Sequence, residues 1–249
     1  MVWILPKRGH RFTGAAYVWN KAQFNAIDTV TTDHLFGLFN SSHMEYETDR
    51  ESDIAGEPSL TEMTIKSIEM LNKNNQGYLL IVESGRIDHG HHEGNAYRAM
   101  VDTSELSSAV EAALNYTNSD ETLIMVTADH SHVFTMAGYP KRGNPILGLV
   151  HKVSDKLAIA RDGKPYTTLS YINGPGAVSG QRDDLSSLDV EDKDFLQQAL
   201  ISLEGETHGG EDVSLHATGP GSYLAQGVIE QNVIFHIINQ VQSLGGTKY

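Results

Sequence analysis

Four side chains that can bind a metal ion or carry protons lie within five positions of one short run, VESGRIDHGHHEG (82–94): Asp88, His89, His91 and His92. Asp88 and His92 are four residues apart, a spacing that places both side chains on one face if the segment is helical. Carboxylate and imidazole ligands without sulfur suit Zn²⁺, at bond lengths of about 2.0–2.2 Å. A metal site, a proton relay and a solvated polar loop are all consistent with this run alone.

Two further segments supply ligands of the same kinds. Asp129 and His130 are adjacent in TADHSH, so they can share one metal only where the backbone bends at the end of a strand. His208, in ETHGGED, is a candidate third ligand for the ion held by Asp88 and His92, because the two glycines after it let that loop approach the sheet edge. Together the three segments predict a metal centre without sulfur ligands.

Glu83, His132 and His91 have separate expected roles. Glu83, an oxygen ligand slightly apart from the imidazoles, suits a harder ion such as Mg²⁺. His132 is predicted to hold a ligand in place by hydrogen bonding, and His91 to face solvent or support the structure. For each segment taken alone, the alternative is a polar loop or strand end whose groups are simply hydrogen-bonded.

A strand, a helix and a second strand must position these side chains. GYLLIVES (77–84) and ETLIMVTADH (121–130) are continuous apolar runs, typical of buried parallel strands, and 95–114 has helical periodicity. This order is a βαβ unit, which indicates an α/β fold with a mainly parallel sheet flanked by helices. Ligands of such sheets bind beyond the carboxyl ends of the strands. We therefore expect the ends of both strands to meet at one site.

The rest of the chain predicts two more helices and an insertion. One helix is expected to run from Pro58, in its first turn, to Asn72, and a closing helix over 227–244. Residues 138–205 differ in character, with Gly and Pro punctuation and the strand-like YTTLSYI (166–172). The predicted parts are an α/β core over 1–137, an insertion over 138–205, and a return to the core over 206–249.

The composition of the chain excludes some classes of binding partner and of metal ligand. The chain has 249 residues, a formal net charge of −14 and no cysteine. The charge argues against nucleic acid and anionic membranes as general partners, and a bound anion would need local cations. Disulfides and thiolate ligands are excluded. No apolar run reaches the roughly 18 residues of a membrane span, and the first residues, MVWILPKRGHRF, have too short an apolar run for a signal peptide.

Seven segments carry a resemblance to a known family: GAAYVWN (14–20), HLFGLFNSSHMEYE (34–47), ESGRIDHGHHEGNAYRAM (83–100), VTADHSHVF (126–134), AGYP (137–140), ETHGGEDV (206–213) and GPGSYLAQGVIEQ (219–231). In this order and spacing they resemble alkaline phosphatase. The resemblance covers nearly the whole chain but only the C-terminal half of the family's fold. It implies a phosphomonoesterase with two zinc ions and one magnesium ion, acting through a phosphoserine intermediate, with residues 138–205 as the family's crown.

The resemblance also implies a ligand set, position by position. His89 takes a place near the bound phosphate, where relatives carry Lys or His. The implied metal ligands are Asp88, His92 and His208 for the first zinc, Asp129 and His130 for the second zinc, and Glu83 for magnesium.

Some of the family's parts have no counterpart here. The nucleophilic serine, the arginine that binds phosphate, the aspartate that bridges the second zinc and magnesium, and a hydroxyl ligand of magnesium belong to the family's N-terminal half. No Asp-Ser-Ala nucleophile motif occurs in this sequence. We therefore expect no catalytic nucleophile in this chain. The expected partners are phosphate monoesters, inorganic phosphate as an inhibiting product, a complementary N-terminal half, and a second copy of the complete enzyme.

Several implications of the resemblance stay open. The family implies a periplasmic, extracellular or membrane-anchored location. A calcium site known in animal relatives would use the positions of Asn40 and Glu57, but Asn40 stands where an acidic residue is expected. Two other functions remain: a phosphodiesterase or sulfatase of the same superfamily, and a non-catalytic metal-binding or interaction protein.

Overall fold

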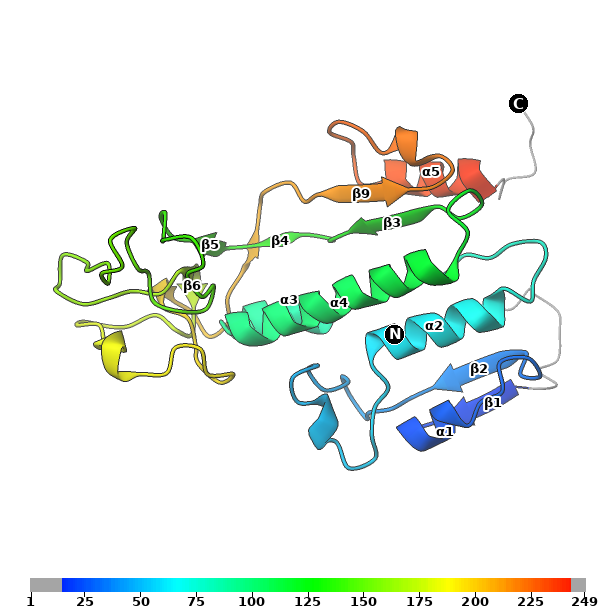
Figure 1. Cartoon of the computed structure of the whole chain (residues 1–249), viewed down its shortest axis with the longest axis horizontal. Helices are drawn as coiled ribbons and strands as arrows, with labels where there is room; N and C mark the ends of the chain where they lie inside the picture. Colours follow the sequence, from blue (N-terminus) through cyan, green and yellow to red (C-terminus); the bar gives the residue numbers. More distant parts are fainter. Residues whose placement is uncertain (1–14, 243–249) are drawn as a thin grey trace.

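A computed structural model describes residues 15–242 as a mixed α/β structure of short strands and longer helices (Figure 1). The main elements are β1 (Ala15–Val18), α1 (Lys21–Asn25), β2 (His34–Gly37), α2 (Leu60–Leu71), α3 (Arg86–His92), α4 (Ala96–Tyr116), β3 (Ile124–Thr127), β4 (Ser131–His132), β5 (Phe134–Met136), β6 (Leu169–Gly174), β7 (Ala199–Ser202), β8 (His208–Gly209), β9 (Leu215–Thr218) and α5 (Val233–Gln242). Three single-turn 3₁₀ helices lie between them: η1 (Arg50–Ser52), η2 (Leu185–Ser187) and η3 (Ser222–Leu224).

The described strands form four small sheets. β1 and β2 are parallel, β3 pairs antiparallel with β9, and β4 pairs antiparallel with β8. The fourth sheet has the order β5-β6-β7, in which β5 and β6 are antiparallel and β6 and β7 parallel. In Figure 1, β3 and β9 lie side by side. The register of β4 and β8 places His132 opposite His208, so two distant segments bring their imidazoles together.

The predicted parallel pair over 77–84 and 121–130 is wrong. β3 is shorter than expected and pairs antiparallel with β9. Residues 78–84 alternate in exposure as a strand does, with Leu79 and Ile81 47% and 66% exposed. However, they join no ladder with another strand in the 15–242 region. An apolar run predicts the extended shape of a segment, whereas its pairing depends on which other strands the chain supplies.

The helix predicted after Pro58 is α2, and its first turn is set by a capping box. The Ser59 hydroxyl accepts from the Glu62 N–H at 3.2 Å, and the Glu62 carboxylate accepts from the Ser59 N–H at 2.8 Å. The prediction that Pro58 lies in the first turn is wrong, because Ser59 is the N-cap and Pro58 precedes the helix. The helix predicted over 95–114 is α4, which Asn95 caps through its side chain.

α3 is fixed against the start of α4 by a close approach at Gly90. A β-carbon at Gly90 would lie 2.8 Å from the main-chain nitrogen of Ala99, so only glycine allows the two helices this contact. Gly94, between the helices, has a φ of +69°, which an L side chain would strain. The turn from α3 into α4 therefore depends on two glycines, and it sets the direction of every side chain on α3.

The closing helix is shorter than predicted. α5 begins at Val233 and not at 227, where Gly227 has a φ of +72° that interrupts a helix. The predicted end at 244 lies outside the described residues. No helix in the described part of the chain is both long and apolar enough to cross a membrane.

The predicted insertion is joined to the rest of the chain by strand pairing. The strand expected over 166–172 is β6, which pairs with β5, a strand that precedes the insertion. The division at 137 and 205 stays a proposal. A separate core lies around β1, α1, α2 and α4, and its buried residues are Val18, Phe24, Leu60, Met63 and Ala109.

We predict that Asp102, on α4, makes stability fall as pH rises. Burial, with repulsion from Glu47, raises the pKa of Asp102 to about 6 from its ordinary 3.8, against the effect of a hydrogen bond from the Glu47 N–H. Between about pH 4 and 6 the folded chain therefore binds more protons than the unfolded chain, and stability is lost with rising pH. Near neutral pH the free energy of unfolding of Asp102→Asn should exceed that of the parent by on the order of 2 kcal/mol.

Urea unfolding of both chains between about pH 4 and 8 measures this effect. Asp120→Asn, at an exposed position, makes the same change of charge and should keep the parent's pH dependence. If the free energy of unfolding changed with pH equally in Asp102→Asn and in its parent, the raised pKa of Asp102 would be contradicted.

Candidate metal centre

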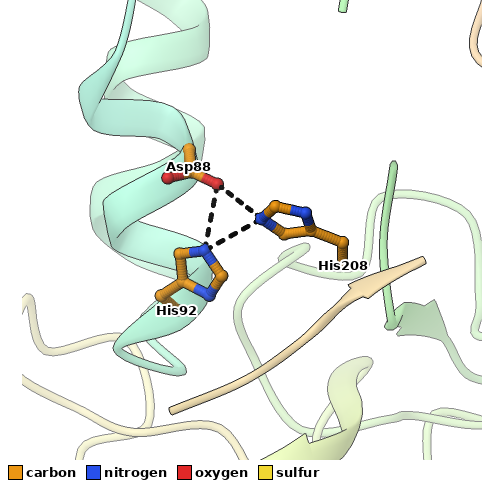
Figure 2. Close-up of side chains that lie close together, drawn as sticks. All are labelled: Asp88, His92 and His208. Atoms are coloured by element: carbon orange, nitrogen blue, oxygen red, sulfur yellow. Dashed lines mark hydrogen bonds and ion pairs between the residues drawn. The ribbon is translucent and has the colours of Figure 1, made fainter. Parts of the chain in front are cut away.

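Asp88, His92 and His208 converge, as Figure 2 shows. Asp88 and His92 lie one turn apart on α3, with 3.2 Å between Asp88 Oδ1 and His92 Nε2. His208 approaches from β8, and its Nε2 lies 3.4 Å from Asp88 Oδ1 and 3.1 Å from His92 Nε2. One helix and one distant short strand thus bring three potential ligands within 4.8 Å of one another.

Two more imidazoles face the same carboxylate oxygen. His132 Nε2 lies 3.2 Å from Asp88 Oδ1, and His130 Nε2 lies 3.7 Å from it. Asp88, His130 and His132 form a second group that could hold a metal ion. The His130 and His208 rings stack with their centroids 3.5 Å apart. The Nε2 atoms of four imidazoles therefore surround Asp88 Oδ1.

The hydrogen bonds on the far side of these rings fix which ring nitrogens face Asp88. His92 Nδ1 faces the Glu206 carbonyl oxygen at 2.5 Å, and His132 Nδ1 faces Glu206 Oε2 at 2.7 Å. An imidazole that donates from Nδ1 presents a lone pair at Nε2 when it is neutral. Asp88 Oδ1, which those lone pairs face, is buried and has no hydrogen-bond partner. A cation bound among these atoms would satisfy all of these acceptors at once.

The other predicted ligands lie outside this convergence. The Asp129 side chain is 83% exposed, although its Oδ2 lies 3.5 Å from His130 Nε2. Glu83 is exposed and belongs to none of the metal-ligand groups found among residues 15–242. It lines a cavity of about 370 Å³ together with His89. The structure therefore brings together Asp88, His92, His208 and His130, but leaves Asp129 and Glu83 apart.

His89 and His91 point to different surroundings from the same helix. Arg86 donates to His89 Nδ1 at 3.0 Å, and burial, then the charge of Arg86, lowers the pKa of His89. His91 contacts the hydroxyl of Tyr171 at 2.8 Å and stacks on His132, and burial lowers its pKa to about 4. Of the two roles expected for His91, support of the structure is the one these contacts fit.

Glu206 is the residue that the sequence interpretation missed. Its side chain is fully buried, and its two carboxylate oxygens accept from His132 Nδ1 and from the Val133 N–H, both at 2.7 Å. The segment ETHGGED drew attention only to its histidine. A buried acid two positions before a candidate ligand could have been suspected only with the strand pairing known.

The arrangement at Glu57 differs from that of a calcium site. Glu57 is 1% exposed, and its oxygens accept from Asn40 Nδ2 at 3.1 Å and from the Glu45 N–H at 2.8 Å. Burial raises the pKa of Glu57. Both oxygens thus have protein donors, and the Asn40 amide presents a donor where a cation would need an acceptor.

These features define an α/β protein with a cluster of histidines and an aspartate that could hold a metal ion. The family model described as alkaline phosphatase matches residues 6–244, and the chain belongs to the alkaline phosphatase family. It is similar to the tissue-nonspecific isozyme of alkaline phosphatase from Homo sapiens, with 42% identity over 94% of this chain, and from Gallus gallus, with 46% identity over 93%.

Solved structures agree on the fold. Alkaline phosphatase from the Antarctic bacterium TAB5 matches with a TM-score of 0.60 and 20% identity, over 92% of this chain and 52% of that chain. The predicted alkaline-phosphatase-like fold is thereby confirmed. This chain spans 44% of each of the two curated relatives, so it corresponds to less than half of their length.

We predict that Asp88→Asn weakens zinc binding more than any change of an exposed acid. The substitution removes the negative charge at the point where four imidazoles meet. The loss should be at least the roughly 10- to 100-fold that removal of an outer-shell partner costs. Calorimetric titration at about pH 8 keeps most imidazoles with an ordinary pKa of about 6.5 neutral, so that protons do not compete with the metal.

Asp120→Asn is the control, because Asp120 is exposed and the change of charge is identical. Equal zinc affinities of the Asp88 and Asp120 variants would show that the metal binds elsewhere.

Proposed function

We propose that this chain supplies most of the metal ligands of a phosphomonoesterase that uses two zinc ions and one magnesium ion. The observation that carries the proposal is the buried, unpartnered Asp88 Oδ1 facing four imidazole nitrogens. Membership of the alkaline phosphatase family supports phosphate monoesters as the substrate class.

The first zinc is assigned to Asp88, His92 and His208. Their ligand atoms already converge, and the oxygen and nitrogen donors are those that zinc accepts in sites without sulfur. Three protein ligands leave a coordination position for substrate, which is the pattern of catalytic and not structural zinc.

The second zinc is assigned to Asp129 and His130, and magnesium to Glu83. His130 supports this assignment by its position beside Asp88, with Asp129 next to it on a strand end. The family resemblance indicates that the ligands completing both sites, a bridging aspartate and a hydroxyl, come from the N-terminal half. The exposure of Asp129 and Glu83 is consistent with ligands whose shared ions need groups from that half.

The metal ions would act as Lewis acids on the phosphate and on the attacking oxygen. The chain's own residues do the rest: they hold the ions, and His89 lies on the cavity wall where its neighbour Arg86 adds positive charge. Local cations are needed because the formal net charge of −14 repels a phosphate ester from the molecule as a whole.

The partners proposed for this chain follow from the same assignment. A complementary N-terminal half would supply the nucleophilic serine and the arginine that binds phosphate, and the completed enzyme would form a homodimer and be inhibited by inorganic phosphate. The location proposed is periplasmic, extracellular or membrane-anchored. The alternative function is a non-catalytic metal-binding protein, which the absence of an Asp-Ser-Ala motif from this sequence favours.

We predict that the purified 249-residue chain binds zinc but does not turn over p-nitrophenyl phosphate. The reason is chemical, because zinc can lower the pKa of a bound hydroxyl, but this chain carries no nucleophile motif for it to activate. Elemental analysis and a phosphatase assay with Zn²⁺ and Mg²⁺ measure both quantities.

Addition of an N-terminal half taken from a related alkaline phosphatase should restore turnover, and the Asp88→Asn chain serves as the control that should not support it. Restored turnover favours a phosphatase whose active site is completed by a separate N-terminal half. Zinc binding with no turnover in any mixture favours the non-catalytic alternative. Turnover by the 249-residue chain alone would overturn the assignment of the nucleophile to another half.

A further inference from the structure

Glu206 contacts two candidate zinc-centre imidazoles through different parts of one residue. Its carboxylate accepts from His132 Nδ1 at 2.7 Å, and its main-chain carbonyl accepts from His92 Nδ1 at 2.5 Å. Its own N–H donates to the His92 carbonyl at 2.9 Å, and its second carboxylate oxygen accepts from the Val133 N–H. Every polar atom of this buried residue is therefore used.

The chemistry of these acceptors fixes where each imidazole carries its proton. An ionised carboxylate and a main-chain carbonyl can only accept, so both Nδ1 atoms must donate. When neutral, His92 and His132 then present the lone pairs of Nε2, and each Nε2 lies 3.2 Å from Asp88 Oδ1. The two rings are thus turned with their metal-binding atoms toward one point.

We propose that Glu206 is a positioning residue of the metal centre, which holds His92 and His132 in the tautomer that keeps the proton on Nδ1. His92 is a proposed zinc ligand and His132 faces the proposed ligand Asp88, and this tautomer turns the Nε2 lone pair of each ring toward Asp88 Oδ1. The proposal rests on the proposed metal site and adds a residue to it. The main-chain carbonyl of Glu206 orients His92, and its carboxylate orients His132. A carboxylate behind an imidazole also makes the ring a stronger ligand.

Glu206 does not act as a ligand itself. It forms a group with His92 and His132 whose ligand atoms lie within 4.8 Å. However, the Nδ1 atoms on that side carry protons, and both carboxylate oxygens already accept hydrogen bonds. A metal ion there would have to displace the hydrogen bonds of both Nδ1 atoms, one to the buried carboxylate and one to the main-chain carbonyl of Glu206.

Glu206→Gln tests the role of the side chain. Glutamine has one acceptor oxygen and one donor amide, so it cannot accept from both Val133 and His132. We expect the amide to donate to His132 Nδ1 and to move the proton of this ring to Nε2. His92 should keep its proton on Nδ1, because its partner is the main chain. Imidazole ¹⁵N chemical shifts of the metal-free chain report both tautomers.

Zinc affinity should fall roughly 10- to 100-fold in Glu206→Gln, as for other outer-shell partners of metal ligands. Glu204→Gln is the matched control, since it makes the same substitution two positions earlier at an exposed site. It should leave both the tautomers and the zinc affinity of the parent unchanged.

Three results would overturn the proposal. One is a parent chain in which His132 or His92 carries its proton on Nε2, a measurement that needs no variant to fold. The others are an unchanged His132 tautomer in a folded Glu206→Gln chain, and equal zinc affinities of the Glu206 and Glu204 variants. If the parent chain binds no zinc, the proposed function fails, while the tautomers of the metal-free chain still decide the role of Glu206.

Discussion

A buried carboxylate oxygen without a donor is the constraint on which this structure depends. Asp88 Oδ1 is surrounded by imidazole nitrogens, at least two of which carry their protons on the opposite side of the ring. Burial of an anionic oxygen among acceptors is unfavourable unless a cation offsets it. The fold thus holds a local arrangement that is poor for the metal-free chain and suited to a metal ion, as expected when binding energy contributes to folding.

Helices and strands that are far apart in the sequence bring the residues around Asp88 together. α3 supplies two candidate ligands on one face, and Gly90 lets that helix lie directly against Ala99 of α4. The β4–β8 pairing sets His132 opposite His208. Bringing these segments together costs loop-closure entropy, which grows only slowly with the length of the intervening chain. The segment between β5 and β8 can therefore be long, although it carries Glu206 and Tyr171, which contact histidines of the site.

Local patterns in the sequence predicted what local physics decides. The helical periodicity around α2 and α4 identified both helices, and the four-residue spacing placed Asp88 and His92 on one face. Long-range relations were not predictable in this way. The antiparallel partner of β3 comes from the far end of the chain. The part played by Glu206 likewise appears only once residues 132 and 206 are known to be neighbours, because an isolated acidic residue in a loop usually faces solvent.

The extended segment before α3 has a consequence for handling the protein. Residues 79–83 make no main-chain hydrogen bond to another residue in the described part of the chain, and Leu79 and Ile81 face outward. Such an unpaired extended segment offers main-chain hydrogen-bonding groups and apolar area to any extended peptide, a second copy of this chain included. Self-association should therefore compete with complementation, and the protein's concentration becomes a variable in every experiment on it.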